Sequence, residues 1–324
     1  MRKQRLRQPV VVTSWFLSRR RRLLALFFAA LCCVIGVVVW LSGKLANLES
    51  EDDVRALPSA AFCNKPRPPL VCAHGGDTSA APPNTKQAFL AAIAAHADCV
   101  EVDCARTSDG VLVVLHTREL QQLLGKRFVP GTQVGDLTSD EIRQLAWPGG
   151  QPVLSVRDAV LLTSPQVECV TLDVKTYQDS TGKAVDSEQV AAAVVQLVHD
   201  TRCSNCLVWA KTDEVVSLIK ALSPGQRAGF ILMNETADAR AAGMHLPLRL
   251  QAPEVVGAHH AMVDEATLQL LRTHGKQLFT WTINDPKVMR RVLDVGVDAL
   301  VTNKLAQAQE AIEWRMQLCG SVRG

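Results

Sequence analysis

Six polar residues stand where short apolar runs of this chain end, and their types suit chemistry on a charged substrate. They are Glu101, Asp103, Asp173, His74, His116 and Lys175. Carboxylate oxygens are the ligands that Mg²⁺ and Ca²⁺ prefer. Two histidines can supply a general acid and a general base near neutral pH. A lysine beside them offers a cation to an anionic substrate.

The spacing of the acidic residues predicts a shared site. Glu101 and Asp103 lie two residues apart in a strand-like run, so their side chains point to one face of a sheet. Adjacent carboxylates are costly to bury unless a cation joins them, and Asp173 can add a third oxygen donor. Each residue alone is more often a cap, a rim residue or a structural histidine. Only the whole set predicts a divalent-metal site with an acid–base pair.

The elements that must position these residues alternate between strands and helices. Strands are predicted over 70–74, 99–103, 111–116, 169–174, 207–210, 228–232, 255–258, 278–283 and 299–302. Helices are predicted over 85–97, 187–200, 213–222, 236–242, 265–274 and 286–295, with caps at Asn84 and Asp285.

Repeated strand–helix pairs indicate a parallel sheet covered by helices. Residues 70–315 have the length typical of a (β/α)8 TIM barrel, which we predict as the fold of this α/β domain. A doubly wound open sheet is the competing fold, but no glycine-rich nucleotide-binding loop follows any predicted strand. The segment 118–152 breaks the alternation and is predicted to be a small insertion, with an active-site wall as one use for it.

The amino terminus predicts a membrane anchor. Residues 1–22 carry eight arginines and lysines and no acid, and the uncharged apolar stretch 23–43 follows. That stretch is long enough to cross a hydrocarbon core of roughly 30 Å. Basic residues before a span keep that end cytosolic, which places the body in a lumen or outside the cell. A cleaved signal peptide and an organelle transit peptide are the alternatives to this transmembrane signal anchor.

Composition and charge predict the nature of the segment before the barrel and limit the class of partner. Residues 44–69 combine acidic residues with a proline cluster, which predicts an extended stem between the span and the barrel. The whole chain has a net charge of +3, so the chain beyond the eight cations of the tail carries −5. A mildly acidic body argues against nucleic acid as a partner. The sequence does not indicate an oligomeric state.

The cysteines in the body fall into two groups. Cys72, Cys99, Cys104 and Cys169 lie in or beside apolar runs and are predicted to be buried free thiols. The lone motif Cys203-Ser204-Asn205-Cys206 is predicted to form a local disulfide, because no second ligand pair with zinc-site spacing accompanies it.

Several sequence blocks resemble, in order, those of the glycerophosphodiester phosphodiesterase family, and a membrane-anchored form of plant and algal type is most similar. The blocks are Cys72-Ala-His-Gly-Gly, Pro82-Pro-Asn-Thr, Cys99-Val-Glu-Val-Asp, Thr107–His116, Leu172-Asp-Val-Lys175, Phe279–Asn284 and Gly296–Asn303. The resemblance covers roughly residues 70–305. It implies a barrel that uses a divalent metal, Mg²⁺ or Ca²⁺, to hydrolyse glycerophosphodiesters to an alcohol and sn-glycerol 3-phosphate in glycerophospholipid catabolism.

The resemblance also assigns roles to the six residues. His74 and His116 match the acid–base pair of the family. Glu101 and Asp103 match metal ligands, and Asp173 stands where the family commonly has a glutamate ligand. Which histidine is the acid stays open, as does the choice between direct attack by water and closure of a cyclic phosphate.

Substrate-side residues match the family in part. Lys175 matches a substrate-side lysine, and Trp281 matches an aromatic residue that lines the glycerol pocket, although packing within a strand explains Trp281 equally well. Gly75 stands where the family usually has a phosphate-binding arginine, and Pro83 stands where it usually has a glutamate. Loss of the arginine removes a planar, bidentate phosphate donor, which leaves substrate range and rate open.

Two other functions fit parts of the sequence. A membrane-tethered phospholipase or lysophospholipase D would need an apolar rim, which Leu120, Leu123, Leu124 and Phe128 could form, although a packed helix explains them equally well. A non-catalytic barrel that only binds ligands would fit the two departures from the family pattern. The complete set of acid–base and metal-ligand residues favours a hydrolase over a binding protein.

Overall fold

The structure is a computed structural model, and it describes residues 57–178 and 184–322. The predicted tail (1–22), the predicted span (23–43) and the first part of the predicted stem lie outside the described residues. Among the helices of the described part, none is both long and apolar enough to cross a bilayer.

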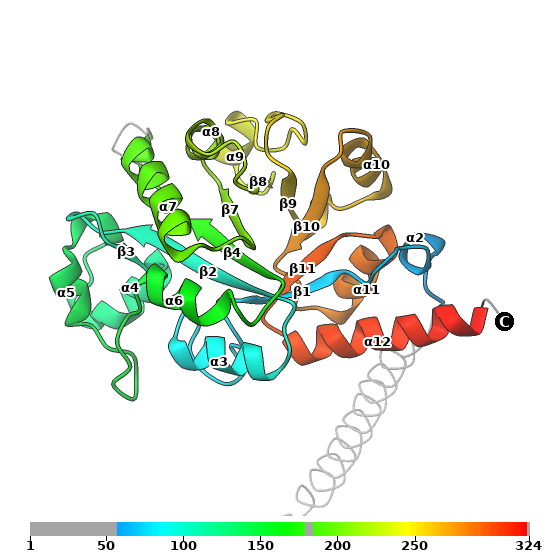
Figure 1. Ribbon diagram of the computed structural model, residues 1–324, viewed down its shortest axis with the longest axis horizontal. Helices are drawn as coiled ribbons and strands as arrows, with labels where there is room; N and C mark the ends of the chain where they lie inside the picture. The colour runs from blue at the N-terminus through cyan, green and yellow to red at the C-terminus, as the bar shows by residue number, and fades with distance from the viewer. Residues whose placement is uncertain (1–56, 179–183, 323–324) are drawn as a thin grey trace, which may run out of the picture. The chain divides into compact units, whose positions relative to one another are not determined.

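Eight parallel strands form a closed barrel (Figure 1). The strands are β1 (Leu70–His74), β2 (Cys99–Arg106), β4 (Cys169–Val174), β7 (Cys206–Ala210), β8 (Ala228–Leu232), β9 (Val255–His259), β10 (Gln277–Trp281) and β11 (Ala299–Thr302). Strand β1 pairs with β11 on one side and with β2 on the other, which closes the barrel. The predicted TIM-barrel fold is therefore confirmed.

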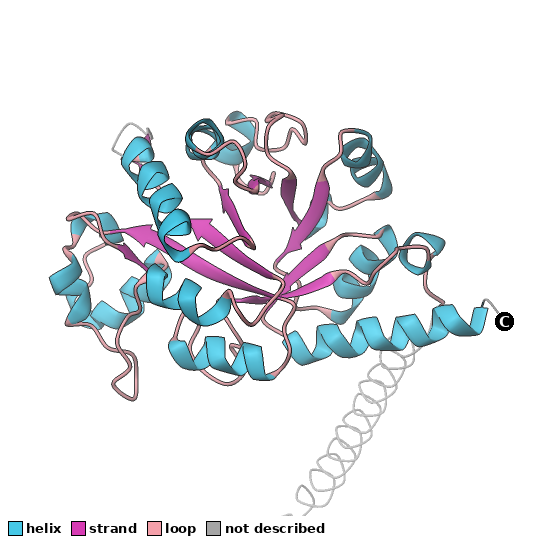
Figure 2. Ribbon diagram, in the orientation of Figure 1, coloured by secondary structure: helices cyan, strands magenta, loops and turns pink. Residues whose placement is uncertain are grey.

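Helices surround the strands (Figure 2). They are α3 (Lys86–Ala94), α6 (Val156–Thr163), α7 (Ser187–Thr201), α8 (Asp213–Leu222), α9 (Ala237–Ala241), α10 (Glu265–Thr273), α11 (Pro286–Val295) and α12 (Leu305–Val322). The predicted cap Asp285 accepts hydrogen bonds from the backbone of Lys287 and Val288. The predicted cap Asn84 is wrong, because the hydroxyl of Thr85 caps α3 instead.

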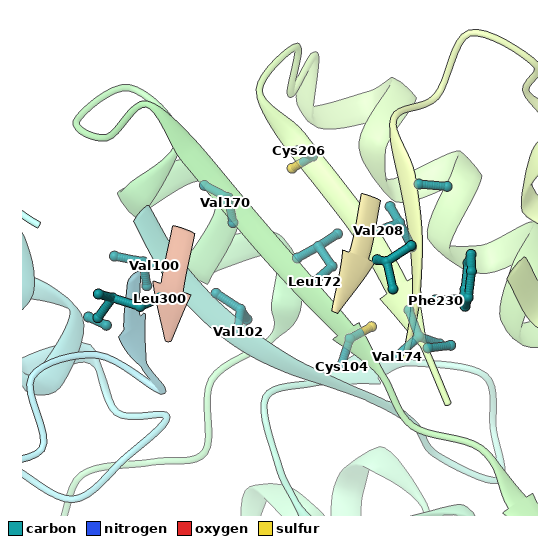
Figure 3. Close-up of a cluster of buried hydrophobic side chains, with 14 of the residues drawn as sticks. Val100, Val102, Cys104, Val170, Leu172, Val174, Cys206, Val208, Phe230 and Leu300 are labelled. Carbon is teal, nitrogen blue, oxygen red and sulfur yellow. The ribbon is translucent and has the colours of Figure 1, made fainter. Parts of the chain in front are cut away.

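Alternation along the strands divides their side chains between two cores. Val100 and Val102 of β2, with Val170 and Leu172 of β4, belong to the core outside the barrel (Figure 3). A second set fills the barrel interior, including Cys72, Cys99, Cys169, Trp209 and Phe279. Because side chains alternate along a strand, the later residues on the interior face of each strand approach the carboxyl-terminal mouth of the barrel.

One predicted strand is not part of the barrel. Residues 111–116 contain only the short strand β3 (Leu112–Val113), which pairs antiparallel with the end of β2. A tight turn causes this difference, because Thr107 Oγ1 accepts the backbone N–H of Val111 at 2.9 Å and the chain doubles back. A parallel barrel strand would need a longer crossover connection.

The predicted insertion carries a small core of its own. It contains α4 (Thr117–Leu124), η1 (Gly125–Arg127), η2 (Val134–Asp136) and α5 (Ser139–Arg143). Leu120 is fully buried in this core, and Leu123 and Leu124 pack against it. These leucines therefore behave as a packed helix face rather than as an apolar rim.

The end of the predicted stem belongs to the barrel. Helix α2 (Ala60–Cys63) begins after Ser59, whose hydroxyl accepts the backbone N–H of Phe62 at 3.1 Å. Phe62 is buried, and a disulfide joins Cys63 to Cys319 of α12. The prediction of a fully extended stem is therefore wrong for this segment, because a buried aromatic side chain and a disulfide attach it to the barrel.

The other predictions about cysteines are confirmed. Cys203 and Cys206 form the expected local disulfide. Cys72, Cys99, Cys104 and Cys169 are free and buried. Sequence spacing gave no indication of the pairing between Cys63 and Cys319, whose partners lie 256 residues apart.

Candidate active site

The pairing of strands brings the predicted acidic residues together at the mouth of the barrel. His74 of β1 is aligned with Glu101 of β2, and Asp103 of β2 is aligned with Asp173 of β4. One oxygen from each of the three carboxylates lies within 4.8 Å of the others. Glu101 and Asp103 are buried, and Asp173 is partly buried. Such a set of hard oxygen donors suits a divalent cation.

His74 lies beside this carboxylate cluster. Its Nε2 is 3.5 Å from Glu101 Oε1, and its Nδ1 is 2.8 Å from Asn303 Oδ1. An amide oxygen can only accept, so Nδ1 of His74 carries the proton and Nε2 of the neutral ring carries the lone pair. Burial lowers the pKa of His74, although the nearby carboxylate of Asp103 opposes this effect. The ring is therefore a neutral proton acceptor at pH 7.

Lys175 neutralises part of the acidic cluster. Its Nζ pairs with Asp103 Oδ1 at 2.5 Å and also with Asp173 Oδ2. Burial opposes the charge of Lys175, but Asp103 and Asp173 outweigh it and raise the pKa of the ammonium. Burial would likewise raise the pKa of Asp103, but the adjacent ammonium of Lys175 holds that pKa well below its ordinary value.

The remaining negative charge supports a metal site. Burial, followed by the charges of Asp173 and Asp103, raises the pKa of Glu101 well above its ordinary value. Asp103 Oδ1 is buried, and no donor within residues 57–178 or 184–322 forms a well-aligned hydrogen bond with it, although the ammonium of Lys175 lies beside it. Three carboxylates and one ammonium leave an excess of negative charge, so the donors fit a divalent ion.

His116 reaches the site from a loop rather than from a strand end. It precedes α4, where its Nδ1 accepts the backbone N–H of Arg118 at 3.2 Å. The neutral ring therefore carries its proton on Nε2, the opposite tautomer from His74. Burial and the charge of Lys175, with smaller contributions from Arg118 and Lys211, lower the pKa of His116 to about 4.

Asn84 and Glu119, which were not predicted as site residues, connect the acidic cluster to the loop that carries His116. Asn84 is fully buried, and its amide donates to Asp103 Oδ2 at 2.7 Å and to both oxygens of Glu119 at 3.0 Å. Glu119 in turn accepts the backbone N–H of His116 at 2.9 Å. Burial, followed by the charge of Asp103, raises the pKa of Glu119 to about 7. This chain of hydrogen bonds links a candidate metal ligand to the loop that carries His116.

The other half of the mouth is aromatic and basic. Trp281 ends β10, is partly buried, and donates its indole N–H to the carbonyl of Gly257 at 2.8 Å. Its ring lies 5.2 Å from that of His259, whose Nε2 is 2.8 Å from Glu235 Oε1. Lys211 follows β7, and its Nζ lies 5.7 Å from the centre of the Trp281 ring. The structure thus gives Trp281 both a packing contact and a partly exposed face.

Comparisons with known proteins identify the family of the chain. Residues 74–307 match the model of the glycerophosphoryl diester phosphodiesterase family. The chain is 36% identical over 253 residues to glycerophosphodiester phosphodiesterase GDPD4 of Arabidopsis thaliana, covering 76% of this chain and 74% of that protein.

Solved structures support the same fold. One is a phosphodiesterase of Oleispira antarctica in complex with the product sn-glycerol-3-phosphate, with a TM-score of 0.60, 21% identity, and coverage of 76% of this chain and 97% of that one. Another is glycerophosphodiester phosphodiesterase of Thermotoga maritima, with a TM-score of 0.59, 20% identity, and coverage of 78% and 100%. From the matched residues, which span nearly the whole barrel, we conclude that this chain belongs to the glycerophosphoryl diester phosphodiesterase family.

Proposed function

We propose that the protein hydrolyses glycerophosphodiesters to an alcohol and sn-glycerol 3-phosphate, as a step in glycerophospholipid breakdown. The observation that carries this proposal is the convergence of Glu101, Asp103 and Asp173 at the barrel mouth, with His74 Nε2 3.5 Å from Glu101. Metal-binding oxygens and an imidazole in one place suit displacement at a phosphodiester.

The three carboxylates are the proposed ligands of a divalent ion, Mg²⁺ or Ca²⁺. When bound, such an ion would neutralise charge on the phosphoryl group and orient the reacting oxygens. Asn84 holds Asp103 in place through its 2.7 Å hydrogen bond. Lys175, already beside Asp103 and Asp173, would cancel part of the acidic charge and so reduce the repulsion of an anionic substrate.

The hydrogen bonds of the two histidines support different proton roles. His74 donates through Nδ1 to Asn303, which leaves the Nε2 lone pair free to accept the proton of the attacking oxygen. His116 accepts the Arg118 N–H at Nδ1 while its ring is neutral. As the general acid it would act as the imidazolium, which releases that backbone contact, passes its Nε2 proton to the leaving oxygen and keeps the proton on Nδ1. A bound phosphodiester anion would raise the pKa of His116 from about 4 and favour the protonated ring.

The full chain in detergent, assayed for sn-glycerol 3-phosphate release from a panel of glycerophosphodiesters, tests this function. We expect turnover that EDTA abolishes and that Mg²⁺ or Ca²⁺ restores. Intact phospholipids and lysophospholipids belong in the same panel, because release of phosphatidic or lysophosphatidic acid alone would indicate a phospholipase D instead. Binding of glycerophosphodiesters without any turnover would indicate the non-catalytic alternative.

Substitutions distinguish the role of the metal ligands from the role of the two histidines. Glu101→Gln should weaken metal binding and activity together, whereas Glu168→Gln, an exposed change next to the start of β4, should alter neither. His74→Ala and His116→Ala should each lower kcat by about 10²–10⁴-fold without loss of metal binding. The double variant should lose less than the product of the two effects, because groups acting together are not additive. Near-normal turnover of the double variant would contradict the proposed proton roles.

We also propose that the protein is a single-pass membrane protein whose barrel lies in a lumen or outside the cell. The arginine-rich tail and the apolar stretch 23–43 support this orientation. Two disulfides, Cys63–Cys319 and Cys203–Cys206, also favour an oxidising compartment. Protease added to sealed microsomes should remove only the tail, and digestion of the barrel without detergent would contradict the proposed orientation.

A further inference from the structure

Lys211 occupies a mouth position that the mechanism above does not use. It directly follows Ala210, the last residue of β7, which is aligned with Val174 of β4. The next residues along these neighbouring strands are Lys211 and Lys175. Trp209 lies in the barrel interior, and the side chain two residues later points the same way, toward the mouth. The two lysines are therefore neighbours at the same level of the barrel.

The two lysines differ in how their charges are balanced. Lys175 is partly buried and pairs with Asp103 and Asp173. Lys211 is exposed, and no carboxylate of residues 57–178 or 184–322 forms an ion pair with it. Arg118, another cation near the site, has Nη2 3.6 Å from Glu119 and 3.9 Å from Asp103. Of Lys175, Arg118 and Lys211, only Lys211 has no carboxylate partner among the described residues, so its ammonium is available to pair with a ligand.

A contact with Trp281 places the ammonium of Lys211 beside the aromatic half of the mouth. The ammonium of Lys211 lies 5.7 Å from the centre of the Trp281 ring, within the range of a cation–π interaction. Trp281 is itself fixed by its hydrogen bond to the carbonyl of Gly257. Lys211 is also among the charges that lower the pKa of His116.

We infer that Lys211 binds the phosphoryl anion of the substrate, pairing its ammonium with a phosphate oxygen between the acidic cluster and Trp281. This inference rests on the proposed function and assigns its anion-binding residue. The loop after β1 cannot supply such a cation, because Gly75 and Gly76 follow His74. Lys211 reaches the mouth from β7, which is separated from β1 by β2 and β4.

Inhibition by inorganic phosphate tests the inference in the full chain in detergent. A hydrogen bond to a charged group is worth about 1.5–3 kcal/mol, so Lys211→Gln should raise the inhibition constant of phosphate and the KM of the substrate by about tenfold or more. The kcat should change far less. Lys211→Arg should preserve both constants, and inhibition by glycerol, which carries no charge, should be the same in all variants.

Arg202→Gln is the matched control, because it removes an exposed cation from the opposite end of β7 and should leave every constant unchanged. An unchanged phosphate inhibition constant in an active Lys211→Gln variant would overturn the inference. If the wild type shows no turnover, the proposed function fails by itself. Phosphate binding measured by calorimetry then still tests Lys211, and equal affinities in wild type, Lys211→Gln and Lys211→Glu would overturn it.

Discussion

Gly75 and Pro83 are held against each other beside the candidate active site. A Cβ on Gly75 would lie 2.9 Å from the Cβ of Pro83, and the carbonyl of Gly75 accepts the backbone N–H of Asn84 at 2.8 Å. Gly75 also has a φ of +67°, where residues with side chains are strained. The two departures from the family pattern are therefore physically coupled, because Pro83 fills the space that a side chain at position 75 would need.

The first prediction distinguishes the cost of the positive φ at Gly75 from the cost of its close contact with Pro83. Gly75→Ala should lower the free energy of unfolding by about 1–3 kcal/mol, because it adds a strained backbone and a close contact. Gly131→Ala is the control, since Gly131 also has a positive φ but has open space around it. Urea unfolding should show the larger loss at position 75, with partial recovery in the double variant Gly75→Ala/Pro83→Gly. Equal losses at both glycines would mean that Pro83 does not restrict position 75.

A second prediction concerns Asn84. Asn84→Ala removes the donor to Asp103 and Glu119, and loss of such a supporting bond typically costs about 10–100-fold in metal affinity or activity. Thr85→Ala, one residue later, should instead lower stability by about 1 kcal/mol through loss of the α3 cap while kcat stays close to wild type. Activity and metal titration on the two variants check this. Full activity of Asn84→Ala would remove this residue from the site.

The third prediction is a titration of His116. In metal-free protein its ring should titrate near pH 4, so it is neutral at pH 7. Inorganic phosphate should move the midpoint upward, because an anion stabilises the protonated ring, and Lys211→Gln should also raise it by removing a nearby cation. NMR of the imidazole resonances measures both shifts, with His116→Asn for assignment. A midpoint near 6.5 that phosphate leaves unchanged would contradict this account.

The fourth prediction compares the two disulfides. Cys63–Cys319 closes a loop of 256 residues, whereas Cys203–Cys206 closes one of three. If the constraint acts on the unfolded chain, loss of the long-range bond should cost more, about 2–5 kcal/mol. Thermal unfolding of Cys63→Ser, Cys319→Ser and Cys203→Ser should show similar large losses for the first two and a smaller one for the third. A larger loss in Cys203→Ser would reverse this ranking.

The parts of the site that follow strand periodicity were predictable from the sequence. Glu101, Asp103, Asp173 and His74 follow from the rule that side chains alternate and that parallel strands end at one edge. His116 was predicted for the site but on the wrong element, because the turn at Thr107 depends on a side-chain bond that apolar patterning does not reveal.

Other features depend on contacts between distant segments. Asn84 has a φ of +62°, which removes it from the helix cap and directs its amide to Asp103 and Glu119. An asparagine is common at both caps and left-handed positions, so its type alone does not decide between them. The Cys63–Cys319 pairing likewise cannot be deduced from spacing.

The Cys63–Cys319 bond has a mechanical consequence if the chain is tethered through its amino terminus. Tension from the tether would arrive at residue 57 and reach the disulfide before it reached β1, which begins at Leu70. The bond would pass that load to α12, whose Ala308, Ile312 and Arg315 side chains are buried. The first barrel strand would then not be peeled from its neighbours, and a pulling force would have to detach a whole helix before it disturbed His74.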